Sequence, residues 1–156
     1  MTPTLGRPSL FSTVDAESPE GVAFAQHRGL VEVGREVEAR RRIGDEPMPA
    51  PLPGIDVVTI AERPDLLEAV WLAIGADGYA DIPSPSELAM TLQDWLDEEA
   101  AVPEGSFVAF EGDRIVGYAG MLEDEHGLTT VARSHRGRGL ATYLKRRQLA
   151  WASSAG

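Results

Sequence analysis

The chain has 156 residues and a formal net charge of −11 at pH 7, and 43% of its residues are hydrophobic. Its length suits one domain with a proper core, and its acidic balance argues against a nucleic acid as the main partner. It contains no cysteine, which excludes a disulfide scaffold, a thiolate nucleophile and a cysteine-based zinc site.

The sequence shows neither a long apolar run nor an N-terminal signal segment, so we expect a soluble, cytoplasmic protein with no membrane partner. Its three histidines are scattered without the spacing of metal ligands, and no metal site is expected. Basic residues cluster between positions 133 and 147. This cluster suits one small anionic ligand better than a polyanion.

The first part of the chain predicts a strand, a helix and a second strand. Residues 10–14 fit a short strand. Ser18 and Pro19 are typical of a helix start, and Gly29 is typical of a helix end. Apolar and polar residues alternate over 30–43, which predicts a long strand.

Residues 44–54 contain four prolines and predict a semi-rigid linker. A strand is expected over 55–60, followed by a helix that begins at Pro64 and ends near Gly75 or Gly78. A second helix is expected to open at 84–87 and to carry Leu88, Leu92, Trp95 and Leu96 on one face.

The last part of the chain predicts a hairpin, a strand and a helix. The hairpin joins 107–110 to 115–120 through a turn at 111–114. Residues 127–131 fit a short strand. The helix runs from Gly139 to about Ser153, with Leu140, Tyr143, Leu144, Gln148 and Trp151 on its core face.

A glycine turn joins that last strand to that last helix. Gly137 and Gly139 allow successive backbone N–H groups to point into one concavity, and the helix start adds its free amides and partial positive charge. Three arginines, Arg133, Arg136 and Arg138, surround the turn. The alternative is a solvated basic loop, but the order of strand, turn and helix favours a phosphate or diphosphate site. The spacing fits neither a Walker loop nor a dinucleotide fingerprint.

The turn resembles motif A of the GNAT acetyltransferase superfamily. The motif Arg/Gln-x-x-Gly-x-Gly/Ala is matched by Arg136, Gly139 and Ala141, and the upstream hairpin is also similar to that of the family. The resemblance implies an α/β (α+β) fold with a mixed, mostly antiparallel sheet flanked by helices, and acetyl-CoA as acyl donor. It implies cofactor contacts from Val131, Arg133, Arg136, Gly137, Arg138, Gly139, Leu140 and Ala141.

By this resemblance the parts of the family domain stand in an unusual order. Residues 1–43 are similar to the C-terminal part, 44–54 form a linker, and 55–156 are similar to the N-terminal and motif A part. We expect one composite domain. Two explanations stay open: a fragment of a tandem-domain protein, or a permuted arrangement completed within the chain or by exchange of the N-terminal unit in a homodimer.

Acetyl transfer to an amine also needs a group that accepts the proton of the amine. Candidates lie where the hairpin meets the cofactor strand, and of Glu123, Asp124, Glu125 and His126 we take Glu123 and His126 as catalytic. The alternative is that they form a solvated acidic turn. The tyrosine that family members often use as an acid is matched here by Ala25, which leaves the acid unassigned.

These observations predict an N-acetyltransferase that moves the acetyl group of acetyl-CoA to an amine of a small molecule or peptide. Because no cysteine can form a covalent intermediate, the amine attacks directly. The alternative is a catalytically weak or inactive acyl-CoA-binding or regulatory module of the same type.

Overall fold

The computed structural model describes residues 12–82, 90–123 and 125–155. The chain forms two compact units, Met1–Glu38 and Ala39–Gly156. Each unit is described by itself.

The first unit contains helix α1, Pro19–His27. Ser18 caps it, because its hydroxyl accepts a hydrogen bond from the N–H of Gly21 at 3.2 Å. Gly29 has a φ of +77°, a left-handed conformation common just beyond helix ends. The predicted helix, with its cap and its glycine end, is therefore confirmed.

The two strands predicted beside this helix are wrong for the described residues. Neither 12–14 nor 30–43 forms a strand, and Leu10 and Phe11 lie outside the described residues. The alternating Val31, Val33 and Val37 side chains are 77%, 59% and 92% exposed. Alternation places apolar side chains on one face of an extended segment. A strand also needs a neighbouring backbone with which to form hydrogen bonds, and the local sequence does not specify that neighbour.

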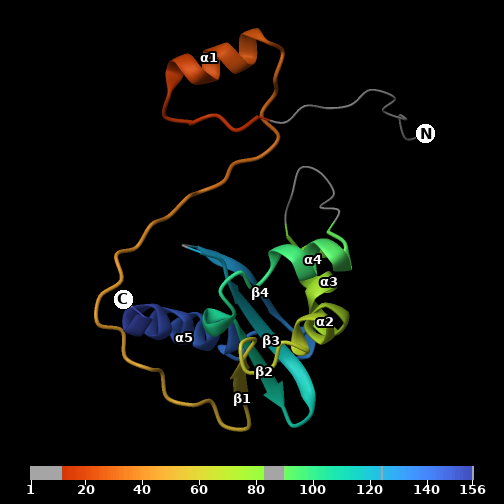
Figure 1. Cartoon of the computed structure of the whole chain (residues 1–156). Helices are drawn as coiled ribbons and strands as arrows, with labels where there is room; N and C mark the ends of the chain where they lie inside the picture. Colours follow the sequence, from red (N-terminus) through yellow and green to blue (C-terminus); the bar gives the residue numbers. More distant parts are fainter. Residues whose placement is uncertain (1–11, 83–89, 124, 156) are drawn as a thin grey trace, which may run out of the picture. The chain divides into compact units, whose positions relative to one another are not determined.

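The second unit is built on a four-stranded antiparallel sheet in the order β1-β2-β3-β4 (Figure 1). Every one of these strands was expected near its observed place, as was the mostly antiparallel sheet flanked by helices. A tight turn with Gly112 at a φ of +63° connects the hairpin strands. The strands are β1 Asp56–Thr59, β2 Phe107–Glu111, β3 Arg114–Met121 and β4 His126–Val131.

The helix expected after Pro64 forms, but with a change of winding in its middle. It begins as α2, Leu66–Val70, passes through a π-helical turn at Trp71–Gly75, and ends as α3, Ala76–Ala80. In a π-helical turn each backbone hydrogen bond joins residues five apart, one more than in an α-helix. Simple apolar spacing does not predict such a turn.

Helix α4 is Leu92–Glu98, and its start differs from the expected one. Thr91 and Asp94 form a capping box, in which the Thr91 hydroxyl accepts from the Asp94 N–H at 3.2 Å and the Asp94 carboxylate accepts from the Thr91 N–H at 3.0 Å. The predicted opening at 84–87 lies outside the described residues. The last helix, α5, is Leu140–Ala155, close to the prediction.

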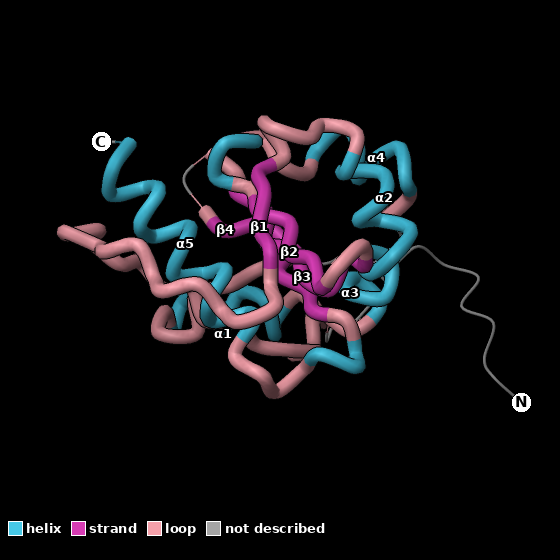
Figure 2. Tube along the Cα trace, turned by 90° about the horizontal axis from the view of Figure 1, so that it is seen from below, coloured by secondary structure: helices cyan, strands magenta, loops and turns pink. Residues whose placement is uncertain are grey.

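Two apolar cores cover the two faces of the sheet. Figure 2 shows α5 on one side of the strands and α2, α3 and α4 on the other. Successive residues of β2 point to opposite cores, as Phe107 and Ala109 face α5 whereas Val108 faces α2 and α4. Trp95 of α4 is fully buried, and its indole N–H donates to the Leu67 carbonyl at 2.9 Å.

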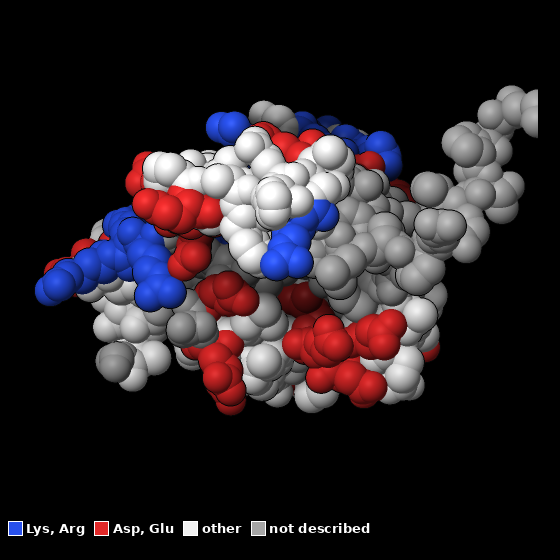
Figure 3. Space-filling view, turned by 90° about the horizontal axis from the view of Figure 1, so that it is seen from above, with Lys and Arg blue, Asp and Glu red and all other residues white. Residues whose placement is uncertain are grey.

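Acidic side chains form several patches on the face shown in Figure 3, in line with the net charge of −11. Within the described residues, none of the helices combines the length and the apolar character that a membrane crossing requires. The same residues contain no group of three or more His, Cys, Asp or Glu side chains arranged to hold a metal ion.

Candidate functional site

A cleft of about 550 Å³ lies between the end of α3, strand β4 and the start of α5. The predicted glycine turn forms one wall, and β4 forms the floor. The lining residues are Gly78, Asp81, Ile82, Leu128, Thr129, Thr130, Val131, His135, Arg136, Gly137, Gly139, Leu140, Ala141 and Thr142.

Residues of the glycine turn and of the start of α5 line this cleft. Gly137 and Gly139 have φ values of +76° and +81°, and a Cβ atom on either would meet nothing within 4 Å. The first hydrogen bond of α5 runs from the Tyr143 N–H to the Gly139 carbonyl at 2.9 Å. Within the described part of the chain, no protein atom accepts from the amides of 137–142. The turn therefore has the free donors that an anion needs.

The cleft also contains a buried hydroxyl without a protein partner. The Oγ1 atom of Thr129, on β4, makes no hydrogen bond to any described residue. A buried hydroxyl that makes no hydrogen bond lowers the stability of the folded protein unless another group bonds to it. The free amides of 137–142 fit a ligand that carries several hydrogen-bonding oxygens.

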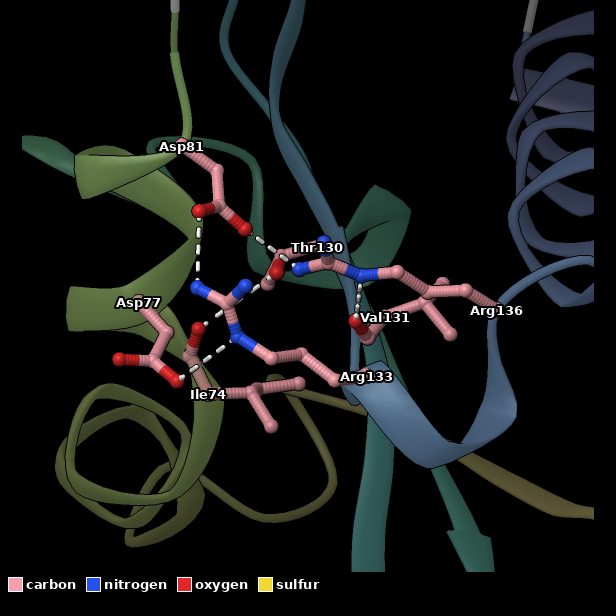
Figure 4. Close-up of polar contacts among 7 residues, drawn as sticks. All are labelled: Ile74, Asp77, Asp81, Thr130, Val131, Arg133 and Arg136. Carbon is pink, nitrogen blue, oxygen red and sulfur yellow. Dashed lines mark hydrogen bonds and ion pairs between the residues drawn. The ribbon is translucent and has the colours of Figure 1, made fainter.

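Two of the three predicted arginines bind one carboxylate at the cleft, as Figure 4 shows. The Nη2 atoms of Arg133 and Arg136 donate to Asp81 at 2.8 and 2.7 Å. The hydrogen bond from Arg136, followed by the charge of Arg133, holds the pKa of the Asp81 carboxyl below its ordinary value. Arg138 is exposed and is not among the residues that line the cleft.

Arg136 also contacts the strand that forms the floor of the cleft. Its Nε atom donates to the carbonyl oxygen of Val131 at 3.0 Å. That carbonyl belongs to the backbone that the family resemblance assigns to the cofactor. The described structure therefore brings Val131, Arg133, Arg136 and the glycine turn together.

His135, inside the glycine turn, is a packed residue. It is 4% exposed, its Nε2 atom lies 3.1 Å from a Glu111 carboxylate oxygen, and its Nδ1 atom lies 2.8 Å from the Ser134 hydroxyl. The hydrogen bond to His135 lowers the pKa of the Glu111 carboxyl. Both ring nitrogens are engaged by protein, so the ring serves to fix the turn against β2.

The predicted catalytic His126 is held by a glutamine on α5. The Nδ1 atom of His126 lies 2.9 Å from the Oε1 atom of the fully buried Gln148. Because Gln148 uses its amide nitrogen to donate to the Gly105, Ala119 and Gly120 carbonyls, its Oε1 atom is the acceptor. His126 thus donates from Nδ1 and keeps the lone pair on Nε2.

His126 is an exposed residue at the start of β4, and partial burial of its ring, followed by the charge of Lys145, lowers its pKa from the ordinary 6.5. A lowered pKa keeps the ring mainly neutral at pH 7, which a general base requires. Glu123 is exposed in the turn after β3, and Asp124 lies outside the described residues. Neither Glu123 nor His126 is among the described residues that line the cleft.

A buried carboxyl that the sequence did not reveal lies beneath β4. Glu99 is 8% exposed and accepts hydrogen bonds from the hydroxyls of Tyr118 and Tyr79 at 3.1 and 3.4 Å. Burial raises its pKa, and the hydrogen bond from Tyr118 partly offsets that rise. A Cβ on Gly120 or Gly127 would lie 1.8 or 2.6 Å from its Oε1 atom. The two glycines are therefore the sequence signal that something occupies this space.

The comparison with protein families matches residues 67–156 to the Acetyltransferase (GNAT) family. This range begins at Leu67, the second residue of α2, extends through α5 and includes every residue of the cleft.

Two curated relatives are both named mycothiol acetyltransferase. The protein of Catenulispora acidiphila is 34% identical over 105 residues, which cover 64% of this chain and 32% of the relative. The protein of Streptomyces bingchenggensis is 36% identical over 101 residues, which cover 61% of this chain and 32% of the relative. The matched region is thus about a third of each relative's length. The family match over more than half of the sequence shows that the chain belongs to the GNAT acetyltransferase family.

Proposed function

We propose that this chain binds acetyl-CoA in the cleft and takes part in moving its acetyl group to an amine of a small molecule or peptide. The observation that carries the proposal is the set of free amides of 137–142. They stand at the start of the 16-residue helix α5, inside the region matched to the family. A diphosphate is the part of the cofactor that such amides bind best.

In this proposal the chain's residues bind different parts of the carrier. The amides from Gly137 to Ala141 hold the diphosphate, and Arg136 adds a full positive charge. The backbone of Val131 and Arg133 lies along the pantetheine arm, with the Thr129 hydroxyl nearby as an unsatisfied donor. Bound acetyl-CoA supplies the activated acyl group, and the exposed Arg138 contributes positive charge from the glycine turn.

We further propose that His126 accepts the proton of the attacking amine at its Nε2 atom, and that Glu123 assists from the adjacent turn. The support is the tautomer that Gln148 imposes and the lowered pKa of the ring. Direct attack follows because the chain has no cysteine to form an acyl intermediate. Since both relatives carry the name mycothiol acetyltransferase, amines of the mycothiol type come first in an acceptor panel.

A second candidate function is an acyl-CoA-binding or regulatory module. Two observations favour it. Glu123 and His126 are not among the residues that line the cleft, and Ala25 stands where the family resemblance expects a tyrosine that acts as the general acid. Thiol release in the presence of amines separates the two functions, because only the enzyme consumes acetyl-CoA when an acceptor is present.

We also propose that the N-terminal unit completes the sheet beside 55–155, either within one chain or by exchange in a homodimer, and that 30–43 becomes a strand only on that pairing. The support is the exposed alternating row of Val31, Val33 and Val37. Sedimentation analysis of the chain with and without residues 1–43 tests this arrangement. Exchange predicts a dimer that becomes a monomer when these residues are removed.

Calorimetric titration with acetyl-CoA tests the cofactor site. We expect Gly139→Trp to abolish binding, because the side chain would enter the cleft. Gly112→Trp is the matched control, since Gly112 also has a positive φ and an equally open Cβ position but lies in the β2–β3 turn. Loss of binding in both variants, or in neither, contradicts the proposed site.

A further inference from the structure

Two arginines at the cleft, Arg136 in its lining and Arg133 beside it, are already paired within the protein. One Asp81 oxygen accepts from Arg133 at 2.8 Å, and the other accepts from Arg136 at 2.7 Å (Figure 4). Asp81 follows the last residue of α3, whereas both arginines follow β4, so the carboxylate connects the two walls of the cleft. Without a ligand, its charge offsets part of the positive charge around the glycine turn.

The same contacts hold Arg136 over the floor of the cleft. Its Nη2 atom is engaged by Asp81 while its Nε atom donates to the Val131 carbonyl at 3.0 Å. Asp81, Val131 and Arg136 all line the cleft. A diphosphate that binds the glycine turn and uses this guanidinium therefore meets a carboxylate in the same place, and two anions do not share one guanidinium without repulsion.

We propose that Asp81 is an internal competitor of the cofactor: its carboxylate neutralises Arg133 and Arg136 in the free protein and is displaced from Arg136 by the diphosphate. The inference rests on the proposed acetyl-CoA site and adds a residue that weakens binding there. Displacement also breaks the ion pair that joins the end of α3 to Arg136. Cofactor binding is thereby coupled to the wall of the cleft that α3 forms, and the coupling works in both directions.

If Asp81 helped the cofactor to bind, its removal would change the affinity for CoA in the opposite direction. If the carboxylate instead held the two guanidinium groups ready for the phosphates, its removal would free their side chains and weaken cofactor binding. If it competes, its removal strengthens binding. The affinity of a variant without this charge therefore decides between the two roles.

The test compares Asp81→Asn with Asp77→Asn in the full chain by calorimetric titration with CoA. Asp77 is the matched control, because its carboxylate lies 3.8 Å from the Nε atom of Arg133 and its side chain is 69% exposed. We expect Asp81→Asn to bind CoA about tenfold more tightly, which corresponds to about 1.4 kcal/mol. The control should stay within about twofold of the original affinity, since exposed ion pairs contribute little.

Inorganic pyrophosphate is the second probe, because it lacks the pantetheine arm and reports on the phosphate contacts alone. The same gain for pyrophosphate in Asp81→Asn supports competition at the guanidinium groups. Unchanged or weaker CoA binding by Asp81→Asn, with the unaltered chain binding CoA normally, overturns this inference and leaves the proposed function standing. Absence of CoA binding in both proteins overturns the two together.

A change in folding is separated from a change in binding by the melting temperature and by a second variant, Asp81→Ser. Both variants remove the charge but differ in size and hydrogen bonding. Tighter CoA binding by both supports competition. A gain confined to Asp81→Asn overturns it, because the effect would then depend on the new amide and not on the lost charge.

Discussion

A Cβ atom on Gly78 would lie 2.6 Å from the Oγ1 atom of Thr130. Helix α3 therefore packs on β4 with no space for a side chain at this point. The Thr130 hydroxyl also donates to the Ile74 carbonyl at 3.5 Å, which ties the strand to the preceding turn of the helix. Because Asp81 comes three residues after Gly78, this close approach fixes how far its carboxylate stands from the glycine turn.

Gly78→Ala is expected to lower the free energy of unfolding by about 1–3 kcal/mol, because the added methyl group overpacks the contact between α3 and β4. Urea denaturation measures the change. Gly75→Ala is the matched control in the same helix, since its Cβ would find its nearest neighbours at 3.4 Å, an ordinary contact. In this control, higher helix propensity should leave stability unchanged or raise it by up to about 1 kcal/mol. An equal loss in both variants would contradict the packing argument.

Glu99→Gln is expected to change how stability depends on pH. Burial raises the pKa of Glu99 in the folded protein above its ordinary 4.5, so between these two pKa values the folded state holds more protons than the unfolded state. Stability contributed by this group is therefore present below pH 4.5 and is lost as the pH rises through the folded pKa. Glu99→Gln has no carboxyl group at this position, so its stability should not fall in this way as the pH rises.

Denaturation of both proteins at a series of pH values over roughly three pH units, from about 4 to neutral, measures the difference. Glu98→Gln is the control, because Glu98 precedes Glu99 on the chain and its side chain is exposed. If the control and Glu99→Gln give the same pH profile, the buried carboxyl is not the source of the effect.

Gln148→Met removes the amide that serves three backbone carbonyls and His126. Since those buried acceptors lose their donor, we expect a loss of about 1–3 kcal/mol in the free energy of unfolding. The hydrogen bond to Gln148 raises the pKa of His126, so the same variant should lower that pKa further. NMR titration of the ring measures it, and a pKa that rises in the variant would contradict the assigned tautomer.

The side chain of Lys145, on α5, is expected to be deprotonated in half of the molecules near pH 8. Burial lowers the pKa of its ammonium group to about 8, and the charge of Glu99 acts in the opposite direction. Glu99→Gln should therefore lower this pKa further. NMR titration of labelled lysine side chains checks both values, and a titration midpoint near the ordinary 10.5 would show that the amine is solvated.

The elements that sequence predicted well are those whose signals are local. The hairpin, strand β4 and helix α5 follow from apolar spacing and glycine positions, and α1 follows from Ser18 and Gly29. The glycine turn was identified for the same reason, because its chemistry lies in consecutive residues.

The parts that sequence did not predict depend on partners distant along the chain. Asp81 stands 52 and 55 residues from the two arginines that it binds, and Glu99 stands 19 residues from Tyr118. No periodic pattern connects such pairs. The strand predicted over 30–43 was wrong for a related reason. Alternation of apolar and polar residues does not specify which neighbouring strand would accept its hydrogen bonds.

The π-helical turn at Trp71–Gly75 determines which side of the helix reaches the cleft. Each residue advances an α-helix by about 100°, so one additional residue in the turn rotates everything that follows by about that angle. Uninterrupted α-helical winding of the same residues would carry Asp81 around the helix axis, away from the arginines. The rotational phase set by this one turn thus decides whether the Asp81 carboxylate faces the two guanidinium groups across the cleft.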